Sequence, residues 1–407
     1  MRLAATLFIC SAVFACGDKK QDRAAAPPLE VLSDAAADGP PPRPMHPLGK
    51  VALSFEPSPE EQAALELVLA SARTTGVTND QLRTPDNARV FLYMAGAHGE
   101  DAALVAEALR GMSRTFTADP RRQATLRPVD DDYRAVVRFN LGVDVATVAG
   151  RAVEAAAPIL SEAEPDAGVV SALAAMIGDQ TDPAAQHAAL SAVPRMREPF
   201  ASEAMVTAHE TALTSAANYV LSRAADNVGR YRGEDRRAAL FTRVSELAAH
   251  ADEGVRGRAA AAMAQLARAD AERSAVVTRL RALLGDGSAF VRSVSAYELG
   301  RLGRFDAVAA FMPMLDDATV NRYDIRGFPT LDDSSGWEHH DGSAWSRVDD
   351  AVLAALVQLT LRETELRFDR PAVRGDDIEG GIARGRDAAR AWYQKHRAAI
   401  EARAAAR

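Results

Sequence analysis

The chain has 407 residues, a formal net charge of −8 and a sequence pI near 5.6. This acidic balance argues against a nucleic-acid partner, because proteins that bind nucleic acids present a basic face to the phosphates. The only cysteines are Cys10 and Cys16, so we expect no disulfide framework, cysteine metal site or thiol nucleophile in the folded part.

The amino terminus is typical of a targeting signal. In "MRLAATLFICSAVFACGDKK", Arg2 precedes an apolar run that ends before Asp18. A bilayer span needs about 20 apolar residues, so this shorter run fits the apolar region of a secretory signal. The ending "VFAC" resembles a bacterial lipobox, which implies a lipoprotein signal peptide over residues 1–15 and acyl chains on Cys16. The alternatives are plain secretion with a free thiol at Cys16, or an amino-terminal tail that is not cleaved.

By this resemblance the protein is lipid-anchored in the bacterial cell envelope. Gly17, rather than Asp, follows the lipidated cysteine. That residue favours the outer membrane or the periplasmic face over the inner membrane. Two or more acyl chains would give a stable anchor.

Residues 16–49 are expected to form a disordered Pro/Ala-rich tether. Stretches such as "DGPPPRPMHP" lack apolar periodicity and cannot bury enough surface to offset the entropy of ordering. His46 is most simply a solvated residue of this linker.

From Ser58 onward the apolar period is that of a helix. "SPEEQAALELVLASA" begins with Ser58 as N-cap, Pro59 in the first turn and Glu61 three residues after the cap, which is a capping box. Further helix starts are expected at Thr84, Asp144, Asp182 and Glu198. Residues 58–235 are therefore predicted to form divergent helical repeats, and strand signals are almost absent before residue 320.

A clear internal repeat follows. The stretches "DEGVRGRAAAAMAQL", "SAFVRSVSAYELGRL" and "WSRVDDAVLAALVQL" align on Val255, Val291 and Val348, and apolar residues recur 8 and 11 positions later, on one helix face. Each of these helices follows another apolar helix, at 236–249, 272–284 and 305–315. One helix pair cannot bury its own apolar stripe, so the pairs must stack.

The stretch 280–317 carries a family resemblance. Leu283-Leu284 end a first helix, Val291-Arg292 open a second, and "LGRLG" at 299–303 closes it. This pattern resembles the HEAT-repeat family in its bacterial form, well over 236–360 and more weakly over 58–235. The resemblance implies an all-α, HEAT-type α-solenoid, whose concave face commonly holds a protein partner.

The last part of the chain completes this prediction. The final helix, "RGRDAARAWYQKHRAAIEARAAAR", has one apolar stripe and one polar face, which suits a capping helix. Residues 236–407 are thus predicted to form HEAT-like repeats closed by this cap. Asp349 and Asp350 are expected to favour the positive start of the helix that contains them.

One insertion interrupts the repeats. The second unit follows the first by 36 residues (255 to 291), and the third follows by 57 (291 to 348). The excess lies at 318–346, where β-favouring residues flank the turn cluster "DDSSG", and this predicts a β-hairpin.

The candidate binding residues gather in and beside this hairpin. They are Trp337, His339, His340, Trp345 and Arg347. Two interpretations remain open. The aromatic side chains cover the edge of the solenoid, or they form a recognition site, since exposed Trp and Arg concentrate interface energy.

Catalytic signatures are missing. His339 and His340 would point to opposite faces of a strand, and the spacing H-E-x-x-H is absent, so no metal site is predicted. Iron hydroxylases built on HEAT-like repeats use repeated His-Glu pairs, whereas this chain has one, His209-Glu210. No G-x-S-x-G or P-loop occurs, so we predict no catalytic residue and no cofactor.

The first functional hypothesis is a non-enzymatic, membrane-anchored HEAT-repeat scaffold that binds a protein partner in the bacterial cell envelope. The alternative is a metal- or glycan-binding module, possibly enzymatic, centred on the hairpin at 320–347.

Overall fold

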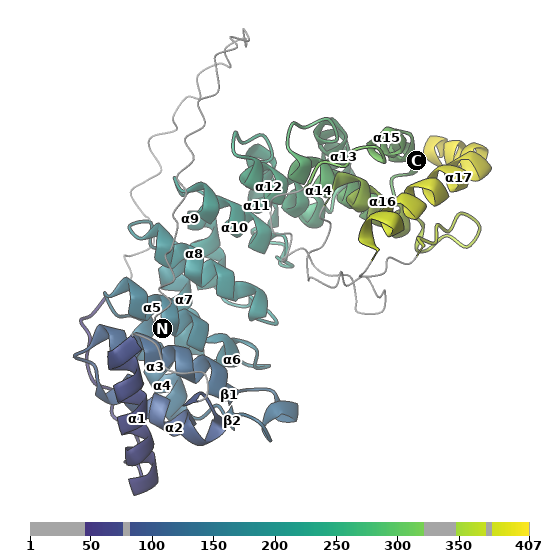
Figure 1. Cartoon of the computed structure of the whole chain (residues 1–407). Helices are drawn as coiled ribbons and strands as arrows, with labels where there is room; N and C mark the ends of the chain where they lie inside the picture. Colours follow the sequence, from purple (N-terminus) through teal and green to yellow (C-terminus); the bar gives the residue numbers. More distant parts are fainter. Residues whose placement is uncertain (1–44, 76–81, 321–346, 372–376, 407) are drawn as a thin grey trace, which may run out of the picture. The chain divides into compact units, whose positions relative to one another are not determined.

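A computed structural model describes residues 45–75, 82–320, 347–371 and 377–406 (Figure 1). The predicted signal peptide, Cys16 and most of the tether lie outside the described residues. So do Trp337, His339, His340 and Trp345.

The described residues are predominantly helical. The α-helices are α1 (Pro59–Thr75), α2 (Ala88–Ala97), α3 (Ala102–Thr115), α4 (Asp131–Leu141), α5 (Ala146–Ala155), α6 (Ala157–Leu160), α7 (Ala167–Gly178), α8 (Pro183–Ala192), α9 (Glu203–Ala212), α10 (Asn218–Val228), α11 (Arg237–Leu247), α12 (Glu253–Leu266), α13 (Asp270–Leu283), α14 (Ala289–Arg301), α15 (Val308–Met314), α16 (Val348–Thr360) and α17 (Ile378–Ala405). Short 3₁₀ helices are η2 (Pro85–Asn87), η3 (Pro120–Arg122), η4 (Val193–Arg195) and η5 (Phe305–Ala307). The strands are β1 (Phe116–Thr117) and β2 (Arg127–Pro128), which pair in parallel.

The helices pack as stacked pairs. α11 packs on α12, α13 on α14 and α15 on α16, and the second helix of each pair packs on the second helix of the next, in the order α10, α12, α14, α16 (Figure 1). Earlier in the chain, α3 packs on α5 and α7 on α9. The prediction of an all-α solenoid of stacked helix pairs is confirmed. Strands before residue 320 are limited to β1 and β2 in the part that the structure describes.

The repeat positions form the core between the pairs. Val255, Val291 and Val348 are all fully buried, as the alignment of the three units requires. Small residues let the helices approach closely. A Cβ added at Gly300 would lie 2.3 Å from the carbonyl oxygen of Ala355, so α14 and α16 touch through their backbones.

Helix starts follow the predicted caps in part. The Ser58 amide donates to Glu61 Oε2 (2.8 Å) and the Glu61 amide donates to Ser58 Oγ (3.2 Å), so the capping box is confirmed. Asp182 caps α8 as predicted, accepting from the Ala185 amide at 3.0 Å. The predicted start at Glu198 is wrong. There the chain turns, and α9 begins after Ser202, whose hydroxyl is a better cap than a glutamate.

The end of the predicted tether needs a correction. His46 forms a parallel bridge with Val143, donating its amide to Gly142 O (3.0 Å), and its ring centroid lies 4.3 Å from that of Phe139. Residues 45–49 therefore pack on the end of α4 and do not form part of a disordered tether. His46 is half-buried where a solvated residue was expected. Backbone pairing of this kind leaves no helical or strand periodicity in so short a segment.

The last helix closes the array. α17 buries Trp392, whose Nε1 donates to the Leu366 carbonyl at 3.0 Å, and also buries Ile400. Among the described residues, none of the helices combines the length and apolar character that crossing a membrane requires.

Candidate functional site

The site lies where the chain leaves and re-enters the repeats around the predicted hairpin. Val320 and Arg347 form an isolated antiparallel bridge, and the Val348 amide donates to Thr319 O at 3.2 Å. The Asp349 amide donates to Asp317 O at 3.0 Å. The two ends of the inserted segment are thus brought together at the start of α16.

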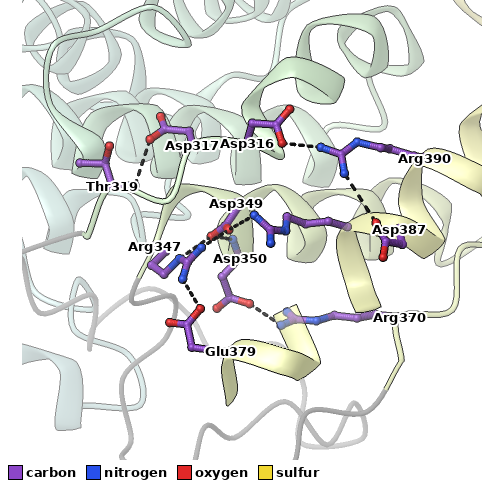
Figure 2. A network of polar contacts seen from close by, with 11 residues as sticks. Asp316, Asp317, Thr319, Arg347, Asp349, Asp350, Arg370, Glu379, Asp387 and Arg390 are labelled. Carbon is purple, nitrogen blue, oxygen red and sulfur yellow. Dashed lines mark hydrogen bonds and ion pairs between the residues drawn. The ribbon is translucent and has the colours of Figure 1, made fainter. Parts of the chain in front are cut away.

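Arg347 is the one candidate binding residue that the structure describes. Its guanidinium donates from Nε and Nη2 to both carboxylate oxygens of Asp349, at 3.0 and 2.6 Å, and from Nη1 to Glu379 (Figure 2). The hydrogen bond to Asp349 raises the pKa of Arg347, so its charge is permanent. Only 12% of the side chain is exposed. To bind a partner, Arg347 would have to exchange these carboxylates for the partner's groups.

Two adjacent aspartates form the buried centre of the site. Asp349 and Asp350 are both fully buried at the start of α16. Asp349 is paired with Arg347, and Arg386 of α17 lies 3.7 Å from it. Asp350 is paired with Arg370, which is equally buried (Figure 2). From the sequence, both aspartates are expected only to favour the positive start of the helix, and their arginine partners are not predicted. We call Arg347, Asp349, Asp350, Arg370, Glu379 and Arg386 the charged clasp.

Asp349 of the charged clasp occupies the repeat position at which the two earlier units carry an arginine. Arg256 holds both oxygens of Asp286 at 2.8 Å, and Arg292 donates to Asp317 at 2.9 Å. Each also donates to a carbonyl of the turn before its own helix, Arg256 to His250 and Arg292 to Asp286, both at 2.7 Å. Each arginine therefore joins one turn to the next along the array.

In the third unit the charge at this position is reversed. Asp349 follows Val348, just as Arg256 follows Val255 and Arg292 follows Val291. The cations come instead from the preceding residue, Arg347, and from α17. The reversal ends the series of arginines and provides an anionic attachment point for the capping helix.

A second contact fastens α17 to the turn before the insertion. Arg390 Nη2 donates to Asp316 Oδ1 at 2.6 Å, and Arg390 also lies 3.7 Å from Asp387 (Figure 2). At the neighbouring Asp317, burial alone would raise the pKa. Hydrogen bonds from Thr319 and Arg292 outweigh it and hold the pKa below its ordinary value. The turn that leads into the insertion is thus held by ionised groups.

The single His-Glu pair, His209-Glu210, lies in α9, away from this site. The two side chains have different surroundings. His209 is fully buried in α9, with Nδ1 2.7 Å from the Met205 carbonyl, whereas Glu210 accepts from Arg236 at 3.1 Å. In the part of the chain that the structure describes, no group of three or more His, Cys, Asp and Glu side chains is arranged to hold a metal ion.

An open cavity of about 650 Å³ lies near the carboxyl end of α17. It is lined by residues 362–366 and by Ala399, Ala402 and Arg403. Arg403 donates across it to Glu363 at 2.9 Å. This pairing also ties α17 to the loop after α16.

No protein-family model matches the chain, and no curated protein matches it. Among solved structures, importin beta is similar at 14% identity, over 83% of this chain and 44% of that chain, with a TM-score of 0.43. An engineered protein is similar at 19% identity, over 65% of this chain and 98% of that chain, with a TM-score of 0.34. Another is similar at 15% identity, over 83% and 96%, with a TM-score of 0.35. With TM-scores this low, the fold assignment rests on the helix packing described above.

Proposed function

We propose that the protein is a non-enzymatic scaffold, lipid-anchored through Cys16 in the bacterial cell envelope, whose stacked helix pairs bind a protein partner. The observation that carries the proposal is the series of arginines across the repeats. Arg256 and Arg292 each join one helix pair to the next, and the charged clasp joins α16 to the capping helix α17. Arrays joined in this way present long continuous surfaces, which repeat proteins use to bind partners.

The chemistry of the clasp supports binding rather than turnover. A general acid or base has to reach its substrate within hydrogen-bond distance. Asp349 and Asp350 are fully buried, and each is held by an arginine. These ion pairs attach the capping helix α17 and the segment before it to α16, which is a structural role.

The anchor is supported by the lipobox "VFAC" at residues 13–16. We propose the outer membrane or the periplasmic face as its location, because Gly17 follows the cysteine. Acylation at Cys16 would hold the repeats near a membrane surface, where an envelope partner is met at high local concentration.

The alternative is a metal- or glycan-binding module centred on 320–347. The observation in its favour is the bridge between Val320 and Arg347, which brings the ends of the Trp- and His-rich segment together. Trp337 and Trp345 would stack on sugar rings, and His339 would be the first metal ligand to test. A saturable rise in Tm with a divalent ion or a glycan would favour this alternative over the scaffold.

The proposal is tested by cross-linking in whole cells, followed by purification of the full chain in detergent. The native chain is compared with a variant that carries Trp337→Ala, His339→Ala and His340→Ala. A matched control carries Arg73→Ala and Lys395→Ala, two exposed residues on α1 and α17. Each captured protein is then purified and its direct binding to the native chain is measured.

We expect to capture one envelope protein that binds the native chain directly. The control variant should bind it with the same Kd. If the hairpin variant binds equally well, the contact lies on the helix pairs. If it alone fails, while its thermal unfolding is unchanged, the hairpin carries the contact. Substrate turnover abolished by changing one polar residue would contradict a non-enzymatic scaffold.

A further inference from the structure

Exposed arginines gather at the carboxyl ends of three consecutive second helices. Arg232 lies in the loop after α10, Arg268 follows α12, and Arg301 is the last residue of α14, and all three are exposed. α10 packs on α12, and α12 packs on α14 (Figure 1). The three helix ends are therefore neighbours on one edge of the array.

Side-chain contacts join these helix ends. A Cβ added at Gly229, just after α10, would lie 2.5 Å from Oε1 of Gln265 on α12. Gln265 in turn lies close to Glu298 on α14, whose Oε2 accepts from Arg301 Nε at 2.6 Å. This chain of contacts links the carboxyl-terminal parts of all three helices.

The carboxylate nearest Arg268 is already engaged, because Glu272 accepts from the Arg268 amide and pairs with Arg237. Arg232 Nη1 donates to two carbonyls, those of Gly229 and Tyr231, at 3.0 and 3.1 Å. Among the described residues, no carboxylate pairs with Arg232 or Arg268. Glu298, the partner of Arg301, is fully buried, and burial raises its pKa.

The arginines are close enough to repel one another. Partial desolvation of the guanidinium lowers the pKa of Arg232, and the neighbouring charges of Arg268, Arg301 and Arg230 lower it further. A favourable interaction with the negative end of the helix dipole explains one arginine at each helix end. It does not offset the repulsion between them, but a bound anion would.

We propose that Arg232, Arg268 and Arg301 form a binding site for a phosphate group. Guanidinium groups match phosphate oxygens in a forked geometry, and a compact dianion would neutralise several arginines at once. An array on a protein of net charge −8 is an unusual place for such a concentration of positive charge. Inorganic phosphate and the phosphate of a lipid headgroup share this chemistry, and the site does not depend on the partner proposed above.

The test uses the full chain with Cys16→Ser, so that no acyl chain contributes to membrane binding. Inorganic phosphate is titrated calorimetrically at constant ionic strength, with chloride as the balancing salt. In parallel, sedimentation is measured with vesicles of phosphatidylcholine, with and without phosphatidic acid. The first arm reports a site for free phosphate, and the second reports a site for a headgroup.

Arg268→Gln is the primary variant, because among the described residues the Arg268 guanidinium makes no hydrogen bond or ion pair that the fold would lose. Arg232→Gln is then added to it. Arg301 is left intact, since its loss would remove the cation that pairs with the buried Glu298. Arg73→Gln, at the exposed end of α1, is the matched control.

We expect saturable binding of phosphate, or of the phosphatidic acid vesicles, that Arg268→Gln weakens about fivefold and the double variant about 20-fold or more. The control should bind like the native chain. The proposal is overturned if phosphate behaves like chloride and neither vesicle type binds. It is also overturned if binding is indifferent to both arginine variants while the chain stays folded.

Discussion

Arg370 and Asp350 form an ion pair in which the arginine side chain is 1% exposed and the aspartate side chain is 0% exposed (Figure 2). Asp350 lies in the first turn of α16, and Arg370 precedes the start of α17. Burying both charges costs desolvation energy, which their attraction offsets only while both are present. The pair therefore makes the end of the array sensitive to the loss of either partner.

Arg370→Met should destabilise the protein by about 3–5 kcal/mol, because it removes the buried arginine with which the buried Asp350 is paired. The double variant Arg370→Met with Asp350→Leu should recover most of this loss. The measurement is urea unfolding followed by circular dichroism.

Arg367→Ala is the matched control for that experiment. Arg367 pairs with Asp369 at 2.8 Å, but both side chains are well exposed. An exposed pair contributes little, so we expect a change below about 1 kcal/mol. A similar loss for Arg367→Ala and Arg370→Met would show that burial of the pair is unimportant.

Gly300→Ala should destabilise the contact between α14 and α16. The new Cβ would lie 2.3 Å from the Ala355 carbonyl oxygen, and a backbone atom can yield only if the helices separate. Overpacking of this kind costs about 1–3 kcal/mol. The unfolding midpoint in urea checks this loss.

Gly150→Ala provides the opposite case within a helix. Gly150 lies in α5, and an added Cβ would meet nothing within 4 Å. Alanine is a better helix former than glycine, so this variant should gain about 0.5–1 kcal/mol. If both substitutions shift stability in the same direction, close packing at Gly300 does not govern the outcome.

The parts of the fold that follow local rules could be predicted from the sequence. The capping box at Ser58 and the buried valines at 255, 291 and 348 depend on spacings within one helix. Such spacings are visible in the sequence because a helix fixes which residues share a face. The predicted tether is too long at its carboxyl end, because His46 is held by backbone pairing with Val143 and such pairing leaves no pattern in the sequence.

The charged clasp could not be predicted in the same way. Asp350 pairs with Arg370, which lies 20 residues later in the sequence, and Asp349 pairs with Arg386 of α17. Many arginines in the chain were equally available by composition. One signal was present: the aligned repeats read Val-Arg, Val-Arg and then Val-Asp, and a reversed charge at a buried repeat position requires new cations.

Cys16→Ser should release the protein from membranes, because acyl chains at Cys16 are the proposed anchor. The measurement is the distribution of the protein between membrane and soluble fractions after a high-salt wash. Cys10→Ser is the matched control and should remain in the membrane fraction. A Cys16→Ser variant that still sediments with membranes after this wash would rule out the lipid anchor.

His209 should make the stability depend on pH. Its Nδ1 lies 2.7 Å from the Met205 carbonyl, so this nitrogen carries the proton, and Nε2 is left to accept from Asn227 at 3.4 Å. Burial lowers the pKa of His209 from 6.5 to about 4. The folded protein therefore keeps a neutral imidazole at pH values where the unfolded chain takes up a proton.

Because the unfolded chain takes up this proton at a higher pH than the folded protein, acid favours the unfolded state. The stability that His209 contributes is fully present above pH 6.5 and is lost as the pH falls towards 4. Between pH 7 and pH 5 the free energy of unfolding should fall by about 2 kcal/mol through this residue. His209→Gln should remove that part of the slope, whatever its effect on the stability at pH 7. The measurement is urea unfolding at both pH values, and equal slopes for His209→Gln and the native chain would place the proton uptake elsewhere.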